Sequence, residues 1–333
     1  DNIRLLEYSD PFGTERQVKA ARKWLHHFGI DAPKENIMVS AGAQNALSVV
    51  LISLFKAGDK IAVDAFTYTN FKGLANFLHI QLISVETDGC GMSPDSLLQA
   101  CRNTEIKGIY LMPTCSNPTS IFMPAARRQE IAEIARRFHL LLIEDDIYSF
   151  LAPSGVRSFF SMLPEQTVHI CSISKSLCAG LRVAFLVFAA KYREALAAGM
   201  LNINLKTVSL NGEIVAELIE SGMAFNIVHQ KLALAEKRNR IFKSVFDVPG
   251  QDDIVRFFYW LPLPEHLTSE EMELRALQKG VHILGSHRFA MTNVQKSSYI
   301  RVSVASPDTE DDLRKGLLIL RNIFGDNAAD FFV

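Results

Sequence analysis

The stretch Ser172-Ile173-Ser174-Lys175-Ser176-Leu177-Cys178-Ala179-Gly180-Leu181-Arg182 sets one lysine among small hydroxyl residues and follows it, after a glycine, with an arginine. The apolar runs 167–171 and 183–189 flank it and are typical of buried strands. A lysine is a nucleophile only when it is deprotonated, whereas hydroxyl groups and a planar guanidinium suit a phosphate monoester. The stretch therefore predicts a strand-connecting loop on which Lys175 binds an aldehyde cofactor. An ordinary solvated turn is the alternative.

Outward from this stretch, apolar runs alternate with helical patterns. Buried strands are expected at 37–39, 61–63, 82–85, 108–112, 140–143, 168–171 and 183–187, with helical patterns such as 126–138 between them. This alternation predicts an α/β fold whose mostly parallel sheet is covered by helices. After the largely helical segment 214–242 the pattern changes to a helix near 269–278, a strand at Tyr299 and a final helix over 310–324. This change predicts a large domain over 31–240 and a smaller α+β domain over 241–333.

The composition excludes several classes of function. Lys plus Arg number 35 against 36 for Asp plus Glu, so this chain has no basic excess for nucleic acid. No apolar run approaches the ~20 residues that cross a bilayer. The five cysteines form no Cys-x-x-Cys pair and no zinc signature occurs, so reduced thiols, a cytoplasmic location and no metal are expected.

Five further segments carry a resemblance. They are Ser40 to Gln44 (SAGAQ), Phe66 to Tyr68 (FTY), Cys115 to Thr119 (CSNPT), Glu144 to Tyr148 (EDDIY) and Tyr299 to Ser303 (YIRVS). In this chain order, with the Lys175 stretch between the fourth and fifth segments, they resemble the landmarks of the fold-type I pyridoxal 5'-phosphate (PLP) enzymes, specifically the aminotransferases. The resemblance covers essentially the whole chain. It implies the PLP-dependent transferase fold, PLP as cofactor, an amino acid and a 2-oxo acid as substrates, and a homodimer with shared active sites. It also implies that residues 1–30 complete the small domain.

The resemblance also implies roles for particular residues. Lys175 would form the Schiff base and shuttle a proton, and Asp145 would keep the pyridine nitrogen protonated, since it ends an apolar run and lies three residues before Tyr148. The phosphate would be bound by Gly42, Ala43, Gln44, Ser172, Ser174 and Arg182. Tyr148 and Asn117 would hold the 3-oxygen, Tyr68 would stack on the ring, and Tyr8 would reach the partner subunit's site.

Arg301 would clamp the substrate carboxylate, near which Asn117 also lies in the family. Each assignment has a structural alternative. Asp145 or Asp146 can cap a helix, Asn-Pro often starts a turn, the tyrosines can be packed aromatics, and Arg301 can form a structural ion pair.

Two positions depart from the family pattern, because Ser120 and Ala184 stand where the family has glycine. Neither loses a reactive group, but both bear on loop geometry. The chain also starts at Asp1, in what resembles an internal segment, so an N-terminal piece is expected to lie outside it.

This start favours a second hypothesis. Glu144 to Tyr148 and the Ser-Lys-Ser-Leu segment also resemble the MocR group of regulators, in which a GntR-type winged-helix domain precedes an aminotransferase-like domain. The chain would then be a PLP-binding domain that senses an effector, and nucleic acid would bind only through a domain absent from it. An upstream helix-turn-helix segment would distinguish the two hypotheses.

Overall fold

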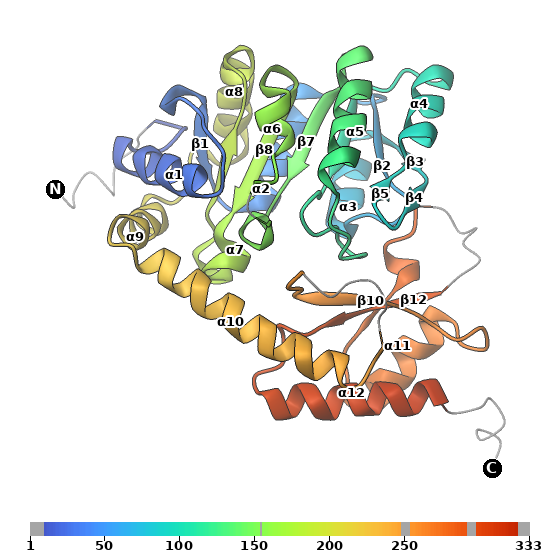
Figure 1. The fold of residues 1–333 in the computed structure, drawn as a ribbon. Helices are drawn as coiled ribbons and strands as arrows, with labels where there is room; N and C mark the ends of the chain where they lie inside the picture. The colour runs from blue at the N-terminus through green and yellow to red at the C-terminus, as the bar shows by residue number, and fades with distance from the viewer. Residues whose placement is uncertain (1–9, 154, 248–253, 292–297, 326–333) are drawn as a thin grey trace. The chain divides into compact units, whose positions relative to one another are not determined.

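A computed structural model describes residues 10–153, 155–247, 254–291 and 298–325 (Figure 1). The contacts divide the chain into two units. Unit 1 comprises residues 1–64, 70–116 and 121–229, and unit 2 comprises residues 65–69, 117–120 and 230–333. The chain passes from unit 1 to unit 2 within α10 (Met223–Lys243). In the described ranges no helix is long and apolar enough to cross a membrane.

Unit 1 is built on a seven-stranded sheet within the described residues, in the order β1-β9-β8-β7-β6-β2-β3. Its strands are β1 (Ile37–Ser40), β2 (Lys60–Asp64), β3 (Gln81–Val85), β6 (Gly108–Leu111), β7 (Leu141–Asp145), β8 (Thr167–Ser172) and β9 (Ala184–Val187). Strands β3, β2, β6, β7 and β8 pair in parallel, and β9 runs antiparallel to β8 and β1. The predicted α/β fold with a mostly parallel sheet is confirmed, and each expected strand is present.

Helices cover both faces of this sheet (Figure 1), as the continuous burial of its central strands requires. The helices that precede α10 are α1 (Glu15–His27), α2 (Ala43–Leu54), α3 (Thr69–Phe77), α4 (Pro94–Asn103), α5 (Ala125–Arg137), α6 (Phe159–Met162), α7 (Ile173–Ser176), α8 (Arg193–Asn204) and α9 (Ser209–Glu220). Short 3₁₀ turns lie at 34–36, 149–151, 164–166, 179–181 and 190–192, and a hairpin of β4 (Thr87–Asp88) and β5 (Gly91–Met92) follows β3.

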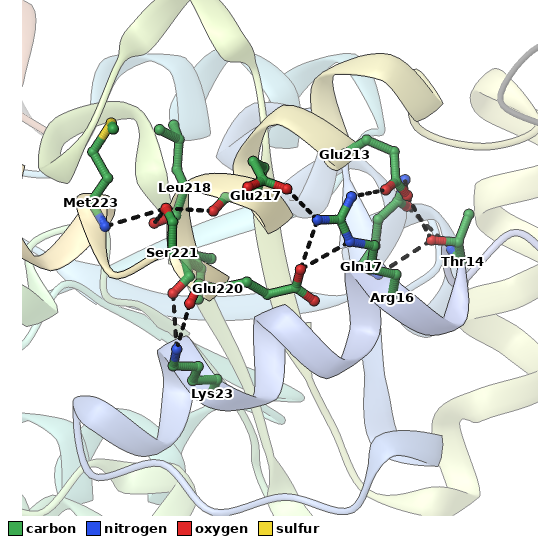
Figure 2. A network of polar contacts seen from close by, with 11 residues as sticks. Thr14, Arg16, Gln17, Lys23, Glu213, Glu217, Leu218, Glu220, Ser221 and Met223 are labelled. Atoms are coloured by element: carbon green, nitrogen blue, oxygen red, sulfur yellow. Dashed lines mark hydrogen bonds and ion pairs between the residues drawn. The ribbon is translucent and has the colours of Figure 1, made fainter. Parts of the chain in front are cut away.

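Helix α1 is fastened to α9 by polar contacts (Figure 2). Arg16 on α1 lies 3.1 Å from Glu213, 2.5 Å from Glu217 and 2.7 Å from Glu220. Lys23 donates to the last carbonyls of α9, at Ile219 and Glu220, where the helix dipole favours a cation.

These contacts, together with packing of α1 on β1, explain a difference from the expected domains. The described part of 1–30 belongs to unit 1 by its contacts, whereas the sequence resemblance places it in the small domain. The amphipathic pattern of α1 predicts that one face is buried, but it does not indicate against which element.

Unit 2 contains an antiparallel sheet in the order β10-β12-β11, formed by β10 (Phe258–Pro262), β11 (Leu284–Gly285) and β12 (Tyr299–Ser303). Helices α11 (Ser269–Gln278) and α12 (Glu310–Gly325) bury their apolar faces in the same core as β10 and β12. The expected helices 269–278 and 310–324 and the strand at Tyr299 are therefore confirmed. The segments 65–69 and 117–120 belong to this unit by their contacts.

Candidate active site

The predicted phosphate site lies at the start of α2. Gly42 precedes the helix with φ +87°, and a Cβ atom there would come 2.6 Å from Nη2 of Arg182. The absence of a side chain on Gly42 therefore lets the guanidinium approach the helix N-terminus, where the first amides have no partner within the helix. Ala43 and Gln44 are the first two residues of α2. This arrangement combines a cation and helix amides, which is the chemistry that a phosphate requires.

Two hydroxyl groups are connected to Arg182 by a chain of hydrogen bonds. Its Nη1 donates to Ser174 Oγ at 3.3 Å, and Ser172 Oγ donates to Ser174 Oγ at 3.2 Å. Arg182 itself adopts the left-handed conformation with φ +49°. The structure thus brings together Gly42, Ser172, Ser174 and Arg182, and their role in binding a phosphate stays a prediction.

Lys175 lies on α7 and is exposed. The prediction of a simple loop between two strands is wrong in this detail, because Ser172 caps a single helical turn by accepting from the amide of Ser174. A Ser at the N-cap followed by residues that tolerate helix is a signal that could have predicted the turn.

Asp145 is the last residue of β7 and is buried. Tyr110 on β6 donates its hydroxyl to Asp145 Oδ2 at 2.8 Å, while Oδ1 is buried and has no hydrogen-bond partner among the described residues. Burial raises the pKa of Asp145 to about 7, although the Tyr110 hydroxyl opposes this. The carboxyl group therefore lacks a donor or cation at Oδ1 within the described chain, and the protonated nitrogen of a pyridine ring would supply one.

A second buried cluster lies beside Asp145: Glu144 and Asp146 belong to the quoted segment 144–148, whereas no sequence motif pointed to His169. His169 on β8 stands opposite Glu144 in the strand register, and its Nδ1 lies 2.9 Å from Glu144 Oε2. The Glu144 carboxylate also accepts from the amides of Phe159 and Phe160, and Arg128 lies 3.9 Å from it. Alternation along a strand turns Glu144 away from the side of Asp145, and the register of β7 and β8 sets His169 as its partner.

The opposite charges in this cluster stabilise one another against the cost of burial. Burial opposes a charge on His169, yet the carboxylates of Glu144 and Asp146 raise the pKa of His169 to about 10. Burial likewise opposes ionisation of Glu144, but His169 and Arg128 lower its pKa below the usual range. Burial raises the pKa of Asp146. Asp146 faces this cluster, since its carboxylate lies within 4.8 Å of the Glu144 and His169 ligand atoms, so the two adjacent aspartates have different surroundings.

The remaining predicted residues in the described ranges are distributed over both units. Tyr148 is buried in unit 1, just after β7. In unit 2, Arg301 lies on β12 with its guanidinium carbon 4.2 Å from the ring centre of Phe258, and Asn117 and Tyr68 lie in the two inserted segments. Tyr8 is outside the described residues.

A mostly parallel sheet with an aspartate at the end of β7 and a lysine in the segment after β8, in a chain with a smaller α+β unit, has the architecture of the PLP-dependent transferase fold of type I. The family described as aminotransferase class I and II matches residues 1–315. The chain belongs to this family.

Two kinds of relatives have sequences similar to that of this chain. YdeF of Bacillus subtilis, described as an uncharacterized HTH-type transcriptional regulator, is 34% identical over 313 residues, which are 93% of this chain and 67% of YdeF. The 2-aminoadipate transaminase of Thermus thermophilus is 25% identical over 316 residues, 92% of this chain and 78% of the enzyme. The chain spans about two thirds of the length of these regulators: 67% of YdeF and 65% of YdfD, a second regulator of Bacillus subtilis.

A solved structure shows the same fold. LysN, the alpha-aminoadipate aminotransferase of Thermus thermophilus, superposes with a TM-score of 0.86 at 22% identity, over 96% of this chain and 83% of that chain. It was solved with N-(5'-phosphopyridoxyl)-L-leucine.

Proposed function

We propose that this chain binds PLP and catalyses amino transfer between an amino acid and a 2-oxo acid. The observation that carries the proposal is the Oδ1 atom of Asp145 at the end of β7, which is buried and has no hydrogen-bond partner in the described part of the chain. A buried carboxylate oxygen without a hydrogen-bond partner destabilises the folded protein unless a donor or a cation binds to it. The phosphate site at Gly42 and Arg182, in the same unit, supports the choice of PLP.

PLP, when bound, supplies the electron sink for the reaction. In the proposal, Arg182, Ser172, Ser174 and the α2 amides hold its phosphate, and Asp145 keeps the pyridine nitrogen protonated. Tyr110 orients Asp145 through their hydrogen bond. Tyr148 and Asn117 bind the 3-oxygen, and Tyr68 stacks on the ring.

The substrate is assigned to two further residues. Arg301, whose guanidinium carbon lies 4.2 Å from the ring centre of Phe258, would bind the α-carboxylate through a two-point contact. Lys175 would hold the cofactor and then move a proton between the substrate α-carbon and the cofactor's C4' atom. A homodimer with shared active sites completes the proposal.

Spectroscopy with purified protein tests the cofactor assignment. Wild-type protein mixed with PLP should gain a visible absorbance band, and borohydride reduction should attach PLP to Lys175. The Lys175→Ala variant should lack the band and release PLP without reductant. Attachment of PLP at an intact site in this variant would contradict the assignment of Lys175.

A second candidate function follows from YdeF and the other relatives described as regulators. In it, the same residues bind PLP and sense an amine effector, and a separate domain binds DNA. A two-half-reaction assay distinguishes the candidates: an enzyme converts bound PLP to pyridoxamine phosphate with an amino donor and restores it with a 2-oxo acid. A spectral change on ligand addition without conversion, together with a winged-helix segment encoded upstream of Asp1, would favour the regulator.

A further inference from the structure

The turn that carries Asn117 ends at Ser120, a residue with an unusual backbone conformation. Ser120 is 2% exposed and adopts φ +55°, a left-handed conformation that favours glycine. The sequence departs from the family glycine at this position. A serine can be held there only if the surrounding structure compensates for the strain, which is about 1–2 kcal/mol for a residue with a Cβ.

Arg256 provides this compensation. Its side chain is buried at 4% exposure, and its Nη1 donates both to the Ser120 carbonyl oxygen and to Ser120 Oγ, the latter at 3.3 Å. Both residues belong to unit 2. A charged donor makes a stronger hydrogen bond than a neutral one, particularly where water is excluded. Arg256 therefore anchors the turn at its last residue, Ser120.

Arg256 is in turn held in place by α10. Asn239 accepts from the Arg256 amide at 3.0 Å and donates to the Arg256 carbonyl at 2.7 Å. Tyr259 donates its hydroxyl to the same Asn239 oxygen at 2.8 Å. These hydrogen bonds fix both the amide and the carbonyl of Arg256, which restricts the position of its guanidinium.

The turn presents two polar atoms that need partners. Asn117 Oδ1 and Thr119 Oγ1 are buried and make no hydrogen bond within the described part of the chain. Buried polar atoms in this state are normally satisfied by a ligand or ordered water. Their positions depend on the backbone of the four-residue segment 117–120.

We propose that Arg256 is a positioning residue for the Asn117 turn, and that the link Asn239–Arg256–Ser120 sets where Asn117 and Thr119 present their oxygens to a bound ligand. The role of Asn117 toward PLP rests on the proposed function. The link itself depends only on contacts within unit 2.

The first measurement needs no cofactor. Hydrogen exchange of residues 115–121 in the cofactor-free protein should speed up roughly tenfold or more in Arg256→Gln, because the turn loses its anchor. Arg238→Gln is the matched control: Arg238 is also a buried arginine of unit 2 that donates to carbonyl oxygens, those of Val304 and Asp308. It should loosen residues 304–308 and leave 115–121 unchanged. Unchanged exchange at 115–121 in Arg256→Gln, or equal acceleration in both variants, would overturn the proposal.

The second measurement reports on the ligand. With PLP bound, the pH at the midpoint of the titration of the visible band should shift by about half a unit or more in Arg256→Gln. The Arg256→Lys variant should largely restore the wild-type midpoint, and Arg238→Gln should leave it unchanged. Equal midpoints in all four proteins would overturn the link to Asn117. If wild-type protein gains no visible band, the proposed function fails, and the exchange measurement still decides whether Arg256 holds the turn.

Discussion

The guanidinium of Arg182 lies against Gly42, so closely that a Cβ atom at position 42 would come 2.6 Å from Nη2 and 2.9 Å from Cζ. Both residues flank the proposed phosphate position, one from the start of α2 and the other from the turn before β9. A phosphate bound here would contact helix amides and a guanidinium at the same time.

Gly42→Ala should therefore weaken PLP binding by roughly tenfold or more, because the new methyl group displaces Arg182. Gly58→Ala is the matched control, since Gly58 has a similar φ of +90° but no atom of the described chain within 4 Å of its Cβ position. Both variants carry backbone strain, so both should lose stability, as measured by denaturant unfolding. Titration of PLP by absorbance separates them: equal weakening would show that strain alone, and no displacement of Arg182, explains the loss.

The two adjacent aspartates should differ in their effect on catalysis. Asp145→Asn should slow removal of the substrate α-proton about a hundredfold or more, because a contact worth ~3 kcal/mol to the pyridine nitrogen is lost. Asp146→Asn should slow it far less, because Asp146 faces Glu144 and His169. Single-turnover absorbance measurements provide the rates, and the reverse ranking would refute the assignment of Asp145.

His169 should make stability depend on pH in the alkaline range. Its pKa is about 10 in the folded protein and 6.5 in the reference state, so the folded state binds the proton more tightly. The stabilisation is complete below pH 6.5 and is lost as the pH rises to 10, by at most ~1.4 kcal/mol per pH unit.

The free energy of unfolding, measured with denaturant between pH 6.5 and 10, should fall less steeply in His169→Gln than in the wild type. His139→Gln serves as the control, because that histidine lies on the surface turn after α5 and takes no part in the cluster. A wild-type slope retained in His169→Gln would mean that another group titrates.

The fastening of α1 to α9 should depend on salt. Arg16→Ala removes the ion pairs with Glu213, Glu217 and Glu220 (Figure 2) and leaves three carboxylates close together. The variant should unfold at a lower temperature than the wild type in dilute buffer, and the difference should shrink near 1 M salt, where charges are screened within about 3 Å. Lys19→Ala, on the same helix, should show neither effect. A difference that persists unchanged in high salt would indicate lost packing instead of lost ion pairs.

Local patterns in the sequence determined much of this protein. The apolar runs between polar segments predicted the parallel sheet, because strands buried on both faces leave no polar positions. The same patterns identified α11 and α12, and the position of Asp145 after an apolar run predicted its place at a strand end. Short motifs of small residues and glycine singled out Gly42, Ser172, Ser174 and Arg182 as candidates for a phosphate site, and that role stays a prediction.

Only the tertiary structure decided which distant residues meet. The pairing of Glu144 with His169 depends on the register of β7 and β8, and the contact of Tyr110 with Asp145 depends on the neighbouring strand β6. Arg256 and Ser120 are 136 residues apart, and α1 packs on a helix almost 200 residues further on. Such contacts arise from the burial of whole faces and from strand register, which no local pattern specifies. The sequence predicted the candidate reactive groups, and the packing of the elements decided which residues surround them.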